Sequence, residues 1–484
     1  MLRYKIQLGM NGLRDGRAGA VGVVERLEKL EAYLARWRDF DFHSDLTQHP
    51  KRGFQSYRMQ HTSDGSILYR VYKSFKDAVV FSPPSMIRGV EKHIWITPLN
   101  RFDKVCALAS DATQDLLVVA ERTNMESSKL HFLSLRQSGE PHLDAAGSIM
   151  LSPTPGVCCY RDSTSELAVW DWREGEILWR LKLGKRVNYT IIDSSHLALA
   201  SEVFGNHARI EIYRIPSSRD AVDIEGVPPK PICALQLPVP AHSKEGSIFL
   251  SSVSCNAPCA TTTFSEEPFT LDPDHAVLAI NFSILTRSPR YEHQYVLLVP
   301  LRTIRKEIRH ALACDAEKPS IAVPWEDWGW GAVVLPLPSM DSLRERPSVP
   351  QCMPASDSLG SHEDLHPEPL GHRYMLLRPS PDGAISLEGG VVLEAMLLDF
   401  SQHHTTDNRP STTSIVSEFA NTKADQVFPP SVFETRLSYR ATLGRISISS
   451  SVLPRVSQIV LQPDGFTAIY MHSVLRPKFL TYYV

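Results

Sequence analysis

After about residue 50, apolar and polar residues alternate with a period close to two in short runs separated by Asp, Gly, Pro and Ser. Runs of this kind, rich in Val, Ile, Leu, Tyr and Trp, are typical of β-strands. No helix-length pattern recurs between them, which disfavours alternating strands and helices. The pattern predicts a mainly β chain. Its predicted strands include SILYRVYKSF, HIWITPL, LLVVAER, KLHFLSL, ARIEIYRI, AVLAINFSIL, YVLLVPL, GGVVLEAMLLDF and RISISSSV.

The start of the chain has a different period. Over Ala20–Arg38, apolar residues recur every three or four positions, with charged residues between them, which predicts an amphipathic helix, the longest of the chain. A shorter helix is predicted within Leu2–Leu13. The apolar stripe is expected to pack against the β part of the chain, and consists of Val21, Val24, Leu27, Leu30, Leu34 and Trp37.

A loose repeat organises the strands. An Asp-containing turn, a strand, a loop and a second strand recur in ASDATQDLLVVAERTNMESSKLHFLSL, IDSSHLALASEVFGNHARIEIYRI and LDPDHAVLAINFSILTRSPRYEHQYVLLVPL. This plan matches the inner half of a β-propeller blade, and a β-sandwich is the alternative. We expect a β-propeller, with seven as the expected number of blades, preceded by a short helical segment.

One hairpin supports this interpretation. LAVWDWREGEILW contains a Trp-Asp dipeptide and predicts a strand over Leu167–Trp172, a turn at Glu174-Gly175 and a strand over Ile177–Leu183. Gly175 supplies the positive φ that a tight hairpin needs. In WD-repeat proteins such a dipeptide ends the third strand of a blade.

The predicted organisation is a helical region over residues 1–45 and a propeller over residues 46–484. Three polar stretches, near residues 217–231, 339–369 and 401–423, are predicted to be unstructured surface insertions because they hold many Pro, Ser, Asp, Glu, His or Thr residues.

Charge and composition narrow the function classes. The formal net charge of −3 gives no compositional support for binding nucleic acid or an anionic membrane. The first residues lack the apolar core of a secretory signal, and no apolar run reaches the roughly 18 residues that span a bilayer. We therefore expect an intracellular protein, in the cytoplasm or nucleus, whose cysteines are thiols.

Two motifs suggest chemistry. His362, Glu363 and His366 spell H-E-x-x-H, and His372 falls where a third zinc ligand would lie in metzincin proteases. Pro367 and the neighbouring Pro and Ser residues oppose the helix that this zinc site requires, so we expect no metal, no cofactor and no catalytic residues here.

The segment PWEDWGWG brings together Trp325, Trp328 and Trp330. Two interpretations are open for it. The first is packing of these rings between blades, and the second is an aromatic patch that faces a partner.

The chain resembles the fungal F-box proteins that carry a divergent WD-like propeller. The resemblance rests on LRYKIQLGMNGLRDG with ERLEKLEAYLARWRDFDF, on LAVWDWREGEILW, on VPWEDWG and on VFETRLSYR. The first pair resembles the helical linker that follows the F-box, but the F-box itself is missing from this sequence. Binding to the Skp-type adaptor of a ubiquitin ligase, which the resemblance implies, is therefore not expected.

The sequence predicts a non-enzymatic protein-interaction propeller with an unidentified protein partner, resembling a substrate receptor without its adaptor-docking module. The alternative is a hydrolase, which would use a pocket on the propeller axis or a zinc site at His362, Glu363 and His366.

Overall fold

The structure is a computed structural model. It describes residues 1–16, 21–48, 57–61, 66–71, 77–85, 87–123, 128–151, 165–183, 188–203, 207–216, 229–239, 246–255, 267–286, 292–314, 321–337, 369–380, 391–401, 428, 432–433, 435, 437, 439–448, 456–472 and 476–483.

The chain is mainly β. Among the described residues, helices are confined to the start of the chain and to one region past its middle. The α-helices are α1 (Leu2–Met10), α2 (Val23–Asp39), α3 (Leu301–Ala313) and α4 (Trp325–Trp328). Single 3-10 turns are formed by η1 (Ala112–Gln114), η2 (Pro273–His275) and η3 (Gly329–Gly331).

Seven sheets follow one another along the described part of the chain, and we number them sheet 1 to sheet 7. Sheet 1 contains β3 (Tyr57–His61), β4 (Ile67–Val71), β5 (Asp77–Ser82) and β6 (His93–Pro98). Sheet 2 contains β7 (Val105–Asp111), β8 (Leu116–Arg122), β9 (Ser128–Ser134) and β10 (Ile149–Leu151). Sheet 3 contains β11 (Ser165–Asp171) and β12 (Glu176–Leu183).

Sheets 4 to 6 continue the series. Sheet 4 contains β13 (Asn188–Asp193), β14 (His196–Val203), β15 (His207–Arg214), β16 (Cys233–Gln236) and the later β21 (Ile321–Val323). Sheet 5 contains β17 (Gly246–Ser254), β19 (Val277–Thr286), β20 (Glu292–Pro300) and β22 (Val333–Pro336). Sheet 6 contains β23 (Arg373–Pro379), β24 (Val391–Asp399) and β25 (Arg440–Ile448).

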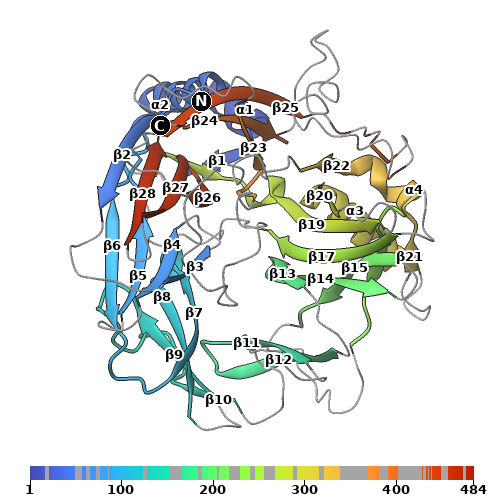
Figure 1. The fold of residues 1–484 in the computed structure, drawn as a ribbon, viewed down its shortest axis with the longest axis horizontal. Helices are drawn as coiled ribbons and strands as arrows, with labels where there is room; N and C mark the ends of the chain where they lie inside the picture. Colours follow the sequence, from blue (N-terminus) through green and yellow to red (C-terminus); the bar gives the residue numbers. More distant parts are fainter. Residues whose placement is uncertain are drawn as a thin grey trace, which may run out of the picture.

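Sheet 7 joins the two ends of the chain. It contains β26 (Val456–Gln462), β27 (Gly465–His472) and β28 (Arg476–Tyr483), and β2 (His43–Gln48) is its outer strand. The antiparallel register of β2 on β28 runs from His43 opposite Tyr483 to Gln48 opposite Lys478. Figure 1 shows the sheets arranged around a ring, with both chain ends close together.

A further small sheet of two strands lies at one side of this ring. It pairs β1 (Leu13–Asp15) with β18 (Phe269–Leu271), so that Leu13 lies opposite Leu271. The start of the chain is thereby joined to the segment that leads into β19 of sheet 5.

The core is divided among the contacts between sheets. One apolar cluster joins sheets 4 and 5 with α3 and α4, and includes Ile210, Ile280, Leu297 and Trp328. Another joins α1 and α2 to β18 and to sheets 6 and 7, and includes Tyr4, Trp37, Phe269, Leu397 and Phe466. Burial between neighbouring sheets explains the period-two pattern, because alternate side chains of each strand face the next sheet.

The predicted long helix is confirmed, and most of its predicted apolar stripe packs as expected: Leu30 and Trp37 are buried, and Leu27 and Leu34 pack against the same apolar cluster. Helix α2 is the longest helix among the described residues, and it ends at Asp39, followed by Phe40 with a φ of 54°. Its buried residues are Arg26, Leu30, Tyr33 and Trp37, whereas Val24 is 72% exposed. The sequence pattern placed Arg26 on the polar face. The structure buries Arg26 and Tyr33 because their polar ends find hydrogen-bond partners.

Helix α3 was left open by the sequence, because the basic stretch Arg302–His310 fits either a short helix or a strand. The sequence pattern continued a strand into Leu301, but β20 ends at Pro300 and the helix begins there. Its buried apolar residues Leu301, Ile304, Ile308 and Ala311 recur at helical spacing. Most of the predicted insertions near 217–231, 339–369 and 401–423 lie outside the described residues.

Candidate functional site

The predicted Trp-Asp hairpin is formed by β11 and β12. Trp172 follows β11 and stacks on Phe132 of sheet 2, with ring centroids 5.9 Å apart. It also meets His142 edge-on at 5.0 Å. The hairpin therefore attaches sheet 3 to sheet 2 through an aromatic contact.

The turn of this hairpin is closed by the carboxylate of Asp171. Its Oδ1 atom accepts hydrogen bonds from the backbone N–H groups of Arg173 and Glu174, at 2.9 and 3.3 Å. The same device occurs in the turns at Asp111, Asp193 and Asp272. The Asp-containing turn of the predicted repeat is thus a structural device.

Gly175 in this turn is expected to resist substitution. Its φ is +75°, and an added Cβ would lie 3.1 Å from the Ala146 side chain. Gly175→Ala should therefore lower the free energy of unfolding by about 1–2 kcal/mol in urea denaturation. Gly9→Ala is the matched control, because Gly9 is inside α1 with open space around it. That change should stabilise the protein or leave it unaffected. Equal effects of the two changes would contradict this account of the turn.

The three tryptophans of PWEDWGWG do not share one environment. Trp325 is 9% exposed and Trp328 is 2% exposed, and their rings meet edge-on at 5.0 Å. The Trp328 Nε1–H donates to the backbone oxygen of Gln236 at 3.0 Å. Trp330 is half-buried. Trp325 and Trp328 are therefore packed inside the protein. Of the three rings, only that of Trp330 could still face a partner.

The H-E-x-x-H residues His362, Glu363 and His366 lie outside the described residues. His372 is described and is fully buried, just before β23. Its Nε2 atom lies 3.6 Å from Oδ1 of Asp399, and neither ring nitrogen makes a hydrogen bond. In the described part of the chain, no three His, Cys, Asp or Glu side chains are grouped so as to hold a metal ion.

Burial lowers the pKa of His372 to about 3, although Asp399 opposes the shift. Arg373, His275 and Arg440 also face the ring and lower its pKa further. The ring is therefore neutral in the folded protein at neutral pH. At pH values between the folded pKa and the ordinary pKa of about 6.5, this histidine is protonated in the unfolded chain but neutral in the folded protein.

Acidification should therefore favour unfolding through His372. The neutral ring of His372 does not destabilise the fold above a pH of about 6.5, the pKa of histidine in the unfolded chain. The free energy of unfolding falls as the pH drops from there toward about 3, the pKa of His372 in the folded protein. Lowering the pH from 7 to 5 should cost about 2 kcal/mol through this group. Between pH 7 and pH 5, the free energy of unfolding measured by urea denaturation should fall less in His372→Asn than in the unchanged protein, by about the same 2 kcal/mol. An identical pH dependence in the variant would show that the buried ring does not titrate in this way.

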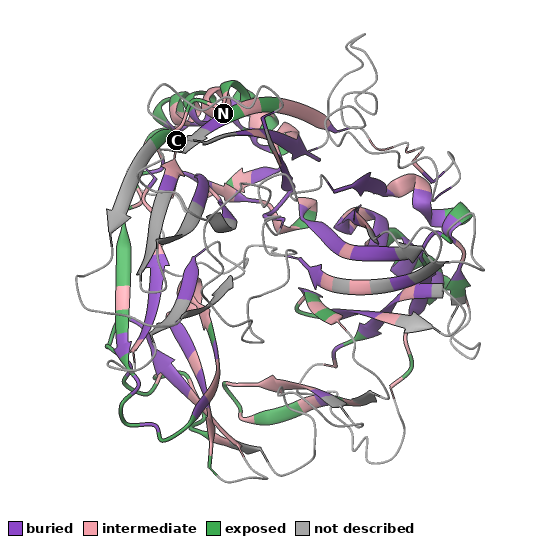
Figure 2. Cartoon of the chain, viewed as in Figure 1, coloured by how far each residue is buried: buried purple, intermediate pink, exposed green. Residues whose placement is uncertain are grey.

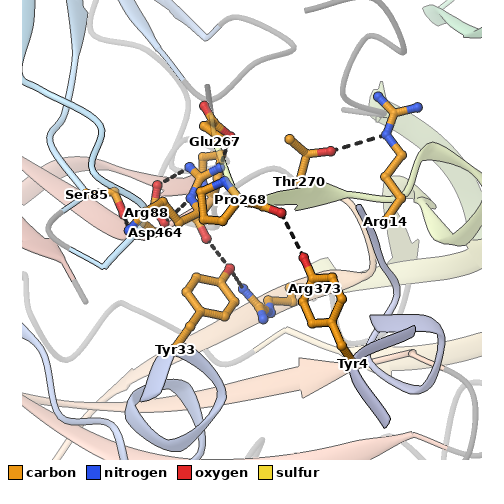
Figure 3. A network of polar contacts seen from close by, with 11 residues as sticks. Tyr4, Arg14, Tyr33, Ser85, Arg88, Glu267, Pro268, Thr270, Arg373 and Asp464 are labelled. Atoms are coloured by element: carbon orange, nitrogen blue, oxygen red, sulfur yellow. Dashed lines mark hydrogen bonds and ion pairs between the residues drawn. The ribbon is translucent and has the colours of Figure 1, made fainter. Parts of the chain in front are cut away.

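A second buried set of polar residues surrounds Arg88. Arg88 lies between β5 and β6 and is 8% exposed. Its Nε donates to Oδ1 of Asp464 at 2.5 Å, and its terminal nitrogens pair with Asp464 and Glu267. Asp464 lies in the turn between β26 and β27, and Glu267 precedes β18. Figure 3 shows the side chains converging from these three separate segments.

Tyrosines from the N-terminal helices flank this set. Tyr33 of α2 donates to the backbone oxygen of Pro463 at 2.5 Å, and Tyr4 of α1 donates to that of Pro268 at 2.8 Å. These acceptors are next in sequence to Asp464 and Glu267. Arg373 donates to the Tyr33 hydroxyl at 2.7 Å and lies 4.1 Å from the Trp37 ring. The helices are therefore fixed at the same place as the ion pairs (Figure 3).

The electrostatics of this set favour a charged guanidinium. Burial alone lowers the pKa of Arg88, but the carboxylates of Asp464 and Glu267 outweigh burial and raise it. Burial also raises the pKa of Tyr33, which keeps its hydroxyl protonated and able to donate. We name Arg88, Glu267 and Asp464 the Arg88 triad. Its chemistry is that of a charge-paired structural contact.

No sequence pattern predicts the Arg88 triad. Arg88, Glu267 and Asp464 are isolated charges in SMIRGVEKH, SEEPF and QPDGF, and no spacing connects them. Only the arrangement of the sheets brings them together. The Tyr33 position, in contrast, falls on the same helix face as Leu30 and Trp37 and could have been found from helical spacing.

The outer strand of sheet 1 exposes apolar side chains. Ile94 and Ile96 of β6 point to one side of the strand and are 42% and 46% exposed. In the described part of the chain, β6 pairs only with β5 and forms the edge of its sheet. Figure 2 shows this strand mainly in the colour of exposed residues along the outside of the ring.

No helix in the described part of the chain is long and apolar enough to cross a membrane.

No protein-family description matches the chain, and no curated protein sequence matches it. Among solved structures, the chain is similar to the WD40 domain of SCAP from fission yeast, with 8% identity and a TM-score of 0.35. The likeness covers 91% of this chain and 98% of that domain. The TM-score is too low for this likeness to support a fold or a function.

Proposed function

We propose that this chain is a seven-bladed β-propeller that serves as a protein-interaction scaffold. Two features support the propeller: the succession of seven sheets in chain order, and the pairing of β2 with β28, which unites the chain ends in one sheet. A propeller protects most of its sheet edges and leaves rigid positions for partner contacts at its rim.

The exposed edge of β6 carries the interaction role. An edge strand offers unpaired backbone groups, and apolar side chains on it favour pairing with another strand. Sheet 4 already shows how such an edge is occupied in this molecule. Its edge strand β16 is covered by β21 in parallel register, from Cys233 opposite Ile321 to Leu235 opposite Val323. We propose that β6 takes an extended partner segment with alternating apolar side chains.

Selection from a phage-displayed library of random peptides tests this proposal. The purified chain should select peptides with apolar residues at alternate positions. The double variant Ile94→Lys/Ile96→Lys should bind synthetic copies of the selected peptides roughly tenfold or more weakly than the unchanged chain. The reason is that two lysines disfavour an apolar strand on this edge. Leu312→Lys is the matched control, since Leu312 of α3 is 62% exposed and far from β6 in the sequence. Failure to select such peptides, or equal binding by the double variant, would refute the β6 site.

The resemblance to F-box proteins adds a narrower proposal, in which the bound partner is a substrate of a ubiquitin ligase. This proposal rests on the sequence resemblance alone.

A further inference from the structure

The Arg88 triad connects the two sheets that begin and end the ring. Arg88 belongs to the connection between β5 and β6 of sheet 1, which is held in place by backbone hydrogen bonds between Ser85 and Val90 at 2.8 and 2.9 Å. Asp464 belongs to sheet 7. Sheets 1 and 7 are neighbours in the ring only because the chain returns to its beginning (Figure 1).

The third member of the triad adds a more distant segment. Glu267 precedes β18, which pairs with β1, and Gly16 N–H donates to Pro268 at 3.1 Å. One guanidinium therefore holds sheet 1, sheet 7 and the small sheet of β1 and β18. The hydrogen bonds of Tyr33 and Tyr4 to Pro463 and Pro268 fasten α2 and α1 beside the two carboxylates.

Loss of the guanidinium would remove the cation shared by the buried carboxylate of Asp464 and the half-buried carboxylate of Glu267. Asp464 is 5% exposed, so its negative charge would remain poorly solvated and would repel Glu267. The segments that carry Asp464 and Glu267 would tend to move apart, and the hydrogen bonds of Tyr33 and Tyr4 beside them would break. The apolar cluster of sheets 4 and 5 contains none of these residues, so it has no direct reason to respond.

We infer that the Arg88 triad is a lock that closes the ring, and that losing it opens the molecule locally between sheets 1 and 7. The opening includes α1, α2 and the β1–β18 sheet. The backbone amides of sheets 4 and 5 stay protected from hydrogen exchange. This role concerns the conformation of the ring and does not depend on whether β6 binds a partner.

Amide hydrogen exchange on the full chain tests the lock. In Arg88→Met, exchange should rise by roughly tenfold or more in α2, β5, β27 and β28, and stay unchanged in β14, β15, β19 and β20. Arg305→Met is the matched control. Arg305 also pairs with two carboxylates from different segments, Asp193 of β13 at 3.6 Å and Asp274 of η2 at 2.7 Å, but away from sheets 1 and 7. It should leave exchange in α2 and β28 unchanged.

A disulfide staple distinguishes opening of the ring from general weakening. Leu46 of β2 lies opposite Leu480 of β28, so Leu46→Cys/Leu480→Cys fixes the chain ends of sheet 7. Once mass spectrometry shows that the bond has formed, the oxidised staple should restore at least half of the protection lost in α2 and β28 of Arg88→Met. Reduction should remove this rescue.

Two results would overturn the inference. One is an equal rise of exchange in all sheets of Arg88→Met, and the other is the absence of any rescue by the oxidised staple. If Arg88→Met does not fold, Arg88→Lys provides the same test, because lysine keeps the charge but cannot bind Asp464 through two parallel hydrogen bonds. Exchange in Arg88→Lys should rise in the same segments, by less.

Discussion

Arg88→Met is expected to lower the free energy of unfolding of the region around sheets 1 and 7 by about 3–5 kcal/mol, because it removes the cation shared by the buried carboxylate of Asp464 and the half-buried carboxylate of Glu267. Arg88 and Asp464 are 8% and 5% exposed, so water cannot replace the lost partner fully. The measurement is equilibrium denaturation by urea at neutral pH, followed by fluorescence.

The control replaces the whole triad. In Arg88→Met/Glu267→Met/Asp464→Leu the uncompensated charges are gone, and a buried ion pair replaced by apolar residues of similar size often costs little. We expect this variant to recover most of the lost stability. A triple variant as unstable as Arg88→Met would mean that the shape of the contact matters more than its charge balance.

Trp328→Ala is expected to cost a similar amount, about 3–5 kcal/mol, through lost packing. The ring is 2% exposed, meets Trp325 at 5.0 Å and donates a hydrogen bond to Gln236. Its loss leaves both a cavity between sheets 4 and 5 and an acceptor without its donor.

Trp330→Ala is the comparison for this prediction. Trp330 is half-buried, and its hydrogen bond with Thr435 uses the backbone oxygen, which alanine keeps. Thermal and urea denaturation should give a loss of about 1 kcal/mol or less. Similar losses at the two positions would contradict the unequal environments in the structure. An effect of Trp330→Ala on partner binding alone would support the partner-facing interpretation of this residue.

The sequence was most informative where structure depends on neighbours in the chain. The Trp-Asp hairpin and its Gly175 turn follow from a local pattern, as do the period-two strands. Helix α2 and most of its apolar stripe were also predicted. The burial of Arg26 and Tyr33 was not, because it depends on hydrogen bonds to other segments of the chain. The sequence did not decide between helix and strand for α3, because the first residue of the helix continues the apolar run of β20.

The Arg88 triad depends on how distant segments come together, and no local sequence pattern indicates it. Glu267 lies 179 positions after Arg88 in the sequence, and Asp464 lies 376 positions after it. A pattern search within one segment cannot relate such residues. The exposure of Ile94 and Ile96 was equally hidden, since HIWITPL resembles the buried strands around it. An edge position is a property of the assembled sheet.

An experimentally determined structure viewed down the ring axis tests the central claim, a closed propeller of seven blades, most directly. The account predicts seven successive sheets, with β2 hydrogen-bonded to β28 so that His43 lies opposite Tyr483. A different number of sheets around the axis, or a ring that stays open between sheets 1 and 7, would contradict it.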